Sequence, residues 1–329
     1  MKLATLSNGT RDGRLVVVSR DLARCRDASA IAATMQIALE SWDASQPRLA
    51  ALARELEADT STGDPFNPHD AMAPLPRAYQ WLDGSAFLNH GRLMQKAFGL
   101  APIGEDLPLV YQGAGDDFLG PRAPIVCASE DHGIDFEGEV GVVFGDVPMG
   151  ASPEGALSQV RLIVQINDVS LRAHAPREMK TGFGFVLAKP SSAFAPVAVT
   201  PDELGGSWRD GRVALPLEIA WNEAWFGAPN GAEMDFSFGE IAAHVLQTRR
   251  FTAGAILGSG TISNRDRAAG SACIAERRAI ELADTGAAKT GFMRFGDRVR
   301  MEMRCADGSP LFGAIEQVVQ RYEARTPAP

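Results

Sequence analysis

The segment from residue 134 to residue 144 constrains the fold more than any other part of the chain. It reads Ile-Asp-Phe-Glu-Gly-Glu-Val-Gly-Val-Val-Phe, and its apolar residues recur with the period of two that is typical of a β-strand. Alternate side chains of a strand share a face, so Glu137 and Glu139 point the same way, roughly 7 Å apart at Cα. The opposite face carries Phe136 and Val140 and can be buried. The segment therefore predicts a strand that is apolar on one side and doubly acidic on the other.

The paired carboxylates allow two interpretations. The strand can be an amphipathic edge whose charged face is solvated. Two like charges at this spacing repel each other, however, and a divalent cation would turn that repulsion into binding. The strand alone leaves both interpretations open.

Length, charge and cysteine content set the broad class. The 329 residues suffice for one large core or two domains, and the apolar content of 45% with 22% charged residues is typical of globular proteins. The formal charge of −9 argues against nucleic acid or an anionic membrane as partner. The four cysteines are scattered and form no Cys-x-x-Cys pair, which favours reduced thiols. With neither a signal peptide nor a membrane span in the pattern, we expect a cytoplasmic protein.

A small α+β N-terminal domain is predicted for residues 1–75. Strands at 2–6 and 14–19 are separated by Asn-Gly and Asp-Gly pairs that favour a hairpin. Apolar stripes predict helices at 27–42 and 46–58. The segment that follows, up to Pro76, is rich in Thr, Ser, Gly, Pro and Asp and is typical of a linker.

Residues 76–329 are predicted to form a second, strand-rich domain. Short apolar runs alternate there with Gly and Pro turns. A helix is expected at 235–246, because Ser237 and Glu240 have the spacing of a capping box. A late strand is expected at 294–303. The whole chain is thus predicted to be α+β and strand-rich.

A third acidic residue follows a different apolar strand. Residues 161–167 end abruptly in Asn-Asp, so Asp168 stands at a strand end, where a carboxylate is often only a turn-former. With Glu137 and Glu139 it can instead complete an oxygen site suited to Mg²⁺, Mn²⁺ or Ca²⁺. Lys189 lies in an apolar, proline-flanked run, where it either reaches the surface or is held by an anion.

Taken together, these motifs resemble the fumarylacetoacetate hydrolase family. The residues that carry the resemblance are the Glu137-x-Glu139 strand, Asn167-Asp168-x-Ser170-x-Arg172, Lys189 and Gly260-Thr261-Ile262-Ser263. The similarity extends from about Trp81 to Met303. It implies a mixed β-sandwich roll, a homodimer, a divalent metal in each subunit, and small 2-oxo or 1,3-diketo acids as substrates.

The resemblance also implies roles for individual residues. Glu137, Glu139 and Asp168 match the three core metal ligands of the family, and Asp83 has the position of a fourth. His90, seven residues after Asp83, matches the catalytic histidine.

Further positions match groups around the substrate. Glu276 resembles the acid that orients the histidine, and Tyr111 resembles a substrate-contacting tyrosine. Arg172 and Lys189 match cations that face the substrate. Two more substrate contacts are expected from the glycine-rich loop, at Gly260 and Thr261.

The histidines leave one choice open. Family members carry a glutamine soon after Arg172, and this chain has His174 and Ala175 there instead. His174 is therefore an alternative base or substrate contact. His132 lies in a polar turn, where an exposed side chain is expected.

The implied activity is hydrolysis of a carbon–carbon bond in a β-diketo acid. Fumarylacetoacetate is the favoured substrate, as in the breakdown of tyrosine. In such a reaction a neutral histidine takes a proton from water, and a divalent metal, Mg²⁺ or else Mn²⁺ or Ca²⁺, stabilises the departing enolate. The alternatives on the same site are acylpyruvate hydrolysis, oxaloacetate decarboxylation, and isomerisation or hydration of 2-oxo acids. A non-catalytic module whose loops are held together by a cation is the contrasting class.

Overall fold

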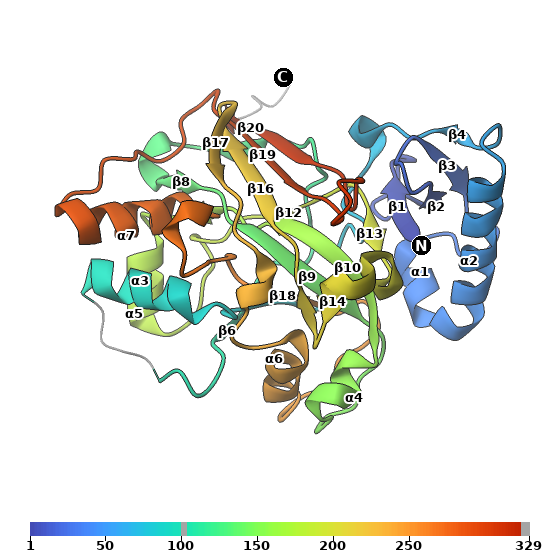
Figure 1. Ribbon diagram of the computed structural model, residues 1–329, viewed down its shortest axis with the longest axis horizontal. Helices are drawn as coiled ribbons and strands as arrows, with labels where there is room; N and C mark the ends of the chain where they lie inside the picture. The colour runs from blue at the N-terminus through green and yellow to red at the C-terminus, as the bar shows by residue number, and fades with distance from the viewer. Residues whose placement is uncertain (100–103, 324–329) are drawn as a thin grey trace, which may run out of the picture.

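The computed structural model describes residues 1–99 and 104–323 and is a strand-rich α+β structure, as predicted (Figure 1). Its largest sheet has 11 strands, in the order β4-β3-β2-β1-β13-β10-β9-β18-β5-β6, with β12 paired to β10. A five-stranded sheet has the order β17-β16-β19-β20-β7, and two small sheets pair β11 with β8 and β14 with β15. The two large sheets enclose a common core, which gives the sandwich that the resemblance implies.

The elements have the following bounds. The strands of the largest sheet, in chain order, are β1 (Lys2–Leu6), β2 (Arg14–Val18), β3 (Arg24–Asp27), β4 (Asp64–Pro65), β5 (Trp81–Gly84), β6 (Val110–Gln112), β9 (Gly138–Phe144), β10 (Val160–Asn167), β12 (Ala193–Phe194), β13 (Ala198–Val199) and β18 (Ile256–Gly258). The other strands are β7 (Ile125–Cys127), β8 (Ile134–Asp135), β11 (Ser170–Leu171), β14 (Trp208–Arg209), β15 (Arg212–Val213), β16 (Leu217–Trp221), β17 (Ala224–Gly227), β19 (Arg298–Met303) and β20 (Ile315–Arg321). The helices are α1 (Met35–Glu40), α2 (Trp42–Ala58), α3 (Leu88–Phe98), α4 (Pro153–Leu157), α5 (Ala175–Thr181), α6 (Phe238–Val245) and α7 (Ile274–Thr285).

Strand β9 separates two apolar cores. Val140 and Val142 belong to the core shared with the five-stranded sheet, which includes Leu217 and Met301. Val143 points to the other face and packs in a second core, which α1 and α2 cover at the N-terminal end of the sheet (Figure 1). The alternation predicted for this segment is therefore confirmed, although the strand is interrupted between β8 and β9. Each such side chain contributes about 1.5–3 kcal/mol when fully buried.

The N-terminal hairpin is confirmed, and one predicted helix is wrong at its start. Strands β1 and β2 pair antiparallel from Lys2 opposite Val18 to Leu6 opposite Arg14. Residues 24–27, which overlap the start of the helix predicted at 27–42, instead form β3 against β2. Asp27 then accepts the Ser29 N–H and begins a turn, so that α1 begins only at Met35. Pairing with a neighbouring strand has overridden local helix propensity here.

The strands on the two sides of residue 75 belong to one sheet. Lys2 of β1 lies opposite Val199 of β13, so the N-terminal strands extend the sheet that contains β10 and β9. The boundary proposed at residue 75 thus divides the sequence without dividing the sheet.

Two other expected elements of the strand-rich part are confirmed. Helix α6 begins after Ser237, whose side chain accepts the Glu240 N–H while the Glu240 side chain accepts the Ser237 N–H. Strand β19 covers the second half of the strand expected at 294–303.

Within residues 1–99 and 104–323, no helix is both long enough and apolar enough to cross a membrane.

Candidate active site

Acidic side chains gather at one edge of the largest sheet. Strand β9 is antiparallel to both β10 and β18, and β5 is parallel to β18. The carboxyl ends of β5, β10 and β18 therefore meet the start of β9. Asp83 comes from β5, Glu139 from β9, and Asp168 directly follows β10.

These three residues form a buried carboxylate cluster. One oxygen of each lies within 4.8 Å of the others, and all three residues are at most 5% exposed. Both carboxylate oxygens of Glu139 are buried, and neither has a hydrogen-bond partner within residues 1–99 and 104–323. Burial and the neighbouring Asp83 and Asp168 raise the pKa of Glu139 well above its usual range. Burial and Asp168 likewise raise the pKa of Asp83 to about 8. Such a cluster requires either protons or a bound cation.

The donor set of the carboxylate cluster fits a hard divalent cation. Carboxylate oxygens are the ligands that Mg²⁺, Mn²⁺ and Ca²⁺ prefer. The orphaned oxygens of Glu139 are the structural feature that points to a missing positive charge, since buried polar atoms are rarely left without a partner. Asp83, Glu139 and Asp168 would hold such an ion.

Glu137 lies beside this cluster and binds cationic side chains. Its carboxylate contacts the guanidinium of Arg172 and the ammonium of Lys189. Although burial opposes ionisation, the charges of Arg172 and Lys189 lower the pKa of Glu137 to about 2. Among the described residues, the three carboxylates that surround a common point are those of Asp83, Glu139 and Asp168, and Glu137 lies outside this group. The role of Glu137 as one of the three core metal ligands, which the resemblance implies, stays a prediction.

Lys189 joins Glu137 to the carboxylate cluster. Its ammonium also donates to Asp168 Oδ2 at 2.6 Å. Burial lowers the pKa of Lys189, but Asp168 and Glu137 outweigh that effect and raise it, so the side chain stays charged. Of the two interpretations left open by the sequence, the anion-held lysine is correct.

Tyr111 and Ser192 hold Asp168 from other directions. The Tyr111 hydroxyl donates to Asp168 Oδ2, and the Ser192 hydroxyl donates to Oδ1 at 2.6 Å. The Lys189 ammonium lies 5.4 Å from the centre of the Tyr111 ring. The sequence interpretation missed Ser192. The available signal was a polar residue three positions after Lys189, in a run that becomes the buried strand β12.

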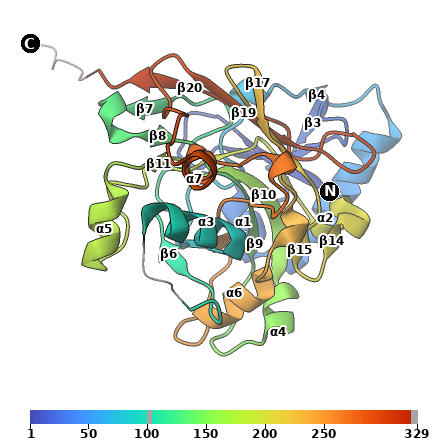
Figure 2. The ribbon, with the colours of Figure 1, turned by 60° about the vertical axis from the view of Figure 1, so that its left-hand side comes forward.

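His90 and Glu276 meet on two neighbouring helices. His90 lies on α3 and Glu276 on α7, and the two helices pack side by side (Figures 1 and 2). His90 Nδ1 is 2.8 Å from Glu276 Oε2. Glu276 is fully buried, whereas the His90 side chain keeps 16% of its surface exposed. A proton on Nδ1 that is donated to the carboxylate leaves Nε2 free to accept one. The structure thus brings together the pair that the sequence singled out.

The glycine-rich loop supports the carboxylate cluster. The Gly260 N–H donates to Asp83 Oδ1 at 2.9 Å, and a Cβ at Gly258 would collide with the same oxygen. Gly260 has a φ of +72°, which favours glycine. Thr261 is buried. The Gly260 N–H therefore holds the Asp83 carboxylate of the cluster, and substrate contacts of Gly260 and Thr261 stay predictions.

His174, the alternative base, lies in a different setting. Its ring packs edge-on against His132, with ring centres 4.8 Å apart. His132 is half-buried, unlike the exposed position expected for it, and its Nδ1 lies 3.4 Å from the Cys127 thiol. Within residues 1–99 and 104–323, His90 forms a hydrogen bond with a carboxylate, whereas His174 forms none with a carboxylate.

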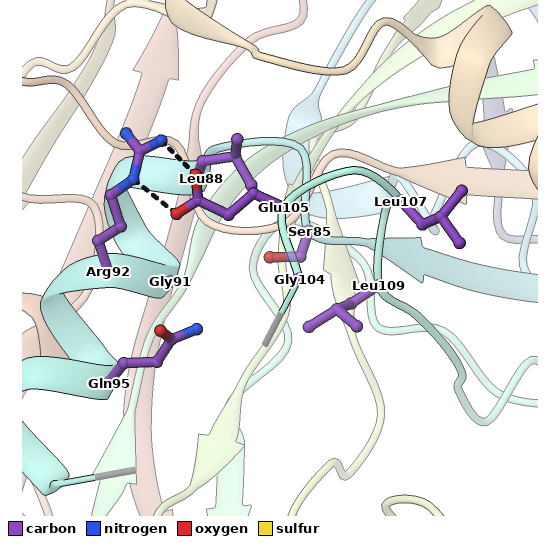
Figure 3. A pocket seen from close by; sticks show the side chains of 9 residues that line it. All are labelled: Ser85, Leu88, Gly91, Arg92, Gln95, Gly104, Glu105, Leu107 and Leu109. Carbon is purple, nitrogen blue, oxygen red and sulfur yellow. Dashed lines mark hydrogen bonds and ion pairs between the residues drawn. The ribbon is translucent and has the colours of Figure 1, made fainter. Parts of the chain in front are cut away.

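A small hollow lies against the helix that carries His90. It has a volume of about 30 Å³ and is lined by Leu88 and Arg92 of α3 together with Leu109 (Figure 3). The Arg92 guanidinium forms a two-pronged ion pair with Glu105, at 2.7 and 2.6 Å. The hollow has room for about one water molecule and is too small for a substrate. The Arg92–Glu105 ion pair beside it attaches α3 to the segment that leads into β6.

Two family models match this chain and together cover most of it. The model described as fumarylacetoacetate (FAA) hydrolase C-terminal matches residues 80–320. The model described as fumarylacetoacetase N-terminal domain 2 matches residues 1–77.

One curated relative is similar over part of the chain. It is the 2,4-didehydro-3-deoxy-L-rhamnonate hydrolase of Sphingomonas sp. (strain SKA58), which is 28% identical over 157 residues. The aligned stretch is 47% of this chain and 52% of that protein, so the match spans about half the length of the relative.

Solved structures share the fold along nearly the whole chain. A putative HpcE protein from Mycobacterium smegmatis has a TM-score of 0.67 at 18% identity, covering 98% of this chain and 100% of that one. A maleylpyruvate hydrolase from Sphingobium sp. SYK-6, in complex with manganese(II) ion and pyruvate, has a TM-score of 0.63 at 15% identity and the same coverage. At these identities the likeness concerns the fold alone.

Proposed function

Because the chain belongs to the fumarylacetoacetate hydrolase family, we propose that it is a divalent-metal-dependent hydrolase of 2,4-dioxo acids of the acylpyruvate type. The observation that carries the proposal is the His90–Glu276 pair beside the buried carboxylate cluster. Strand β5, which carries Asp83, is followed directly by α3, which carries His90. The named relatives include hydrolases of a didehydro sugar acid and of maleylpyruvate, which supports the substrate class.

Cationic side chains would bind the substrate carboxylate. Arg172 uses Nε for Asp135 and one terminal nitrogen for Glu137, and its side chain is 17% exposed. Its remaining N–H groups can donate to a carboxylate, and guanidinium groups suit planar, two-pronged recognition. Lys189 adds fixed positive charge at the base of the site.

His90 would move the proton. Its Nε2 accepts a proton from water while the water oxygen attacks the carbonyl carbon, and Glu276 stabilises the imidazolium through Nδ1. The carbon–carbon bond then breaks, its electron pair leaves with the 2-oxo acid fragment as an enolate, and His90 returns the proton to carbon. The products are a carboxylic acid and a 2-oxo acid. A divalent cation at the carboxylate cluster, with Mg²⁺ and Mn²⁺ as the leading candidates, would supply the positive charge that an enolate needs.

A substrate panel tests the proposal. Purified protein with Mg²⁺ or Mn²⁺ is given acetylpyruvate, fumarylacetoacetate and oxaloacetate, and products are identified before and after chelation. Chelator-sensitive hydrolysis of acetylpyruvate is the expected result, and fumarylacetoacetate, the favoured substrate at the sequence level, is its direct competitor. Release of CO₂ from oxaloacetate alone would assign a decarboxylase instead. A protein that binds metal and converts none of them would be a binding module.

We also propose that the protein is a homodimer, on the basis of the resemblance. Light scattering during gel filtration should give about twice the 35.1 kDa of one chain. A mass equal to one chain across micromolar concentrations would exclude the dimer.

A further inference from the structure

Asp135, a buried carboxylate that the sequence interpretation passed over, connects two parts of the candidate site. It ends strand β8 and is fully buried. Its Oδ1 accepts the Ile274 N–H at 2.7 Å, and its Oδ2 accepts the Ala275 N–H at 2.9 Å. The same Oδ2 accepts a hydrogen bond from the Nε–H of Arg172 at 2.8 Å. One carboxylate therefore binds both the start of α7 and the substrate-facing cation.

The contact with α7 fixes the helix in place. The first N–H groups of a helix have no partner within the helix. Asp135 takes those of Ile274 and Ala275, and the Cys273 thiol takes the next, that of Glu276, at 3.3 Å. An ordinary cap comes from the residue before the helix, whereas Asp135 comes from a strand 139 positions away. It therefore sets the position and rotation of α7, and hence where Glu276 meets His90.

The contact with Arg172 fixes the plane of the guanidinium. Asp135 accepts the hydrogen bond from Nε and Glu137 accepts one from a terminal nitrogen, so two carboxylates fix the orientation of the guanidinium. Residues 170 and 171 also pair with the strand that ends in Asp135. The direction in which Arg172 presents its remaining N–H groups depends on this carboxylate.

We propose that Asp135 is a positioning residue that holds the Arg172 guanidinium and the His90–Glu276 pair in a fixed relation. Arg172 then binds the substrate carboxylate while His90 activates the water that attacks the carbonyl carbon, at a fixed distance from each other. Asp135 itself does not contact the substrate. The catalytic part of this proposal rests on the proposed function. The structural part, a mechanical connection between Arg172 and the first turn of α7, does not.

A double-mutant cycle tests the catalytic part. Asp135→Asn keeps the shape but turns an amide NH₂ toward N–H donors, so it loses at least one of the three bonds. We expect kcat/KM to fall by at least about tenfold, with KM raised through Arg172 and kcat lowered through His90. Adding Asp135→Asn to Arg172→Gln should then raise KM by less than about threefold more, because Arg172 is already absent. A fully additive rise in KM, or a lower kcat at unchanged KM in Asp135→Asn alone as expected from fewer folded molecules, would overturn the proposal.

Two readouts without turnover keep the test independent of the reaction. Hydrogen exchange of the Ile274 and Ala275 amides should accelerate in Asp135→Asn, and calorimetry should show weaker binding of pyruvate to the Mn²⁺-loaded variant, by at least about fivefold. Arg172→Lys leaves Asp135 in place and serves if Asp135→Asn does not fold. It should also accelerate exchange at these two amides, because Asp135 loses its anchor.

A matched control removes an unrelated helix cap. Ser152 caps α4, far from the site, by accepting the Gly155 N–H at 3.1 Å. Ser152→Ala should leave KM, kcat and exchange at the start of α7 unchanged. Unchanged exchange in both Asp135→Asn and Arg172→Lys would refute the connection. If the wild-type protein converts no substrate, the proposed function fails, and exchange and pyruvate binding still decide the role of Asp135.

Discussion

At the scale of single residues, His90 is the side chain on which turnover should depend most. His90→Ala removes the group that accepts the proton, while the carboxylate cluster keeps all its members. We expect kcat to fall by about 10²–10⁴-fold, the usual contribution of a general base, with metal affinity unchanged. Steady-state kinetics and Mn²⁺ titration measure the two quantities. The matched control is His174→Ala, since His174 packs against the ring of His132. A large loss in His174→Ala with none in His90→Ala would transfer the role of base to His174.

The raised pKa values of the carboxylate cluster predict how pH affects cation binding. Burial and the neighbouring carboxylates raise the pKa of Asp83 to about 8 and that of Glu139 well above its usual range. Without a cation Asp83 retains a proton near neutral pH, and a cation must displace it. Affinity for Mg²⁺ should therefore rise as the pH increases from about 6 to 8, with protons released on binding. Calorimetry in buffers of different ionisation enthalpy measures that release. Binding that is independent of pH and releases no protons would contradict the proposed ligands.

At the scale of elements, the segment between Arg172 and Lys189 should control substrate affinity. It contains α5, which stands away from the body of the protein (Figure 2). The Glu178 carboxylate accepts the N–H groups of residues 186, 187 and 188 at 2.8–3.1 Å and so fixes the backbone that enters Lys189.

Glu178→Ala should accelerate hydrogen exchange at residues 186–188 and raise KM by several-fold, with a smaller change in kcat. The control is Lys180→Ala, which alters an exposed residue of the same helix. Equal KM values for Glu178→Ala and the wild-type protein would show that the segment does not position Lys189.

Local sequence patterns predicted those elements whose cause is local. The capping box at Ser237, the hairpin between residues 6 and 14, and the strand that ends at Asn167 all depend on neighbouring residues. Strand β3 was missed because its stability comes from pairing with β2, which no local pattern reveals.

The sequence predicted those site residues that belong to recognisable motifs. The resemblance identified Asp83, Glu139 and Asp168, which the structure brings together. It did not reveal that Glu137 is held by Arg172 and Lys189. Asp135 and Ser192 were missed because their partners, the first turn of α7 and Asp168, are 139 and 24 positions away in the chain.

At the scale of the whole molecule, a bound cation should stabilise the fold. Burial raises the pKa of Glu139 above its value of 4.5 in the unfolded chain. Its contribution to stability is therefore complete below pH about 4.5 and is lost as the pH rises through the higher folded value. A cation reverses this loss, and a ligand at 100 times its Kd stabilises by about 2.7 kcal/mol.

Mg²⁺ should thus raise the Tm at pH 8, and a chelator should lower it. Glu139→Gln should be more stable than the metal-free wild-type protein at that pH and should not respond to Mg²⁺. A Tm that Mg²⁺ leaves unchanged in the wild-type protein, or raises equally in Glu139→Gln, would argue against the site.

The most direct test of the central claim is a crystal structure of the protein soaked in Mn²⁺, with anomalous scattering used to locate the ion. We expect one strong peak bound by carboxylate oxygens of Asp83, Glu139 and Asp168, with His90 and Glu276 still paired beside it. The same map tests whether Glu137 leaves Lys189 to become a fourth ligand. A map with no peak among these carboxylates, or with the ion bound elsewhere, would show that they do not form the metal site.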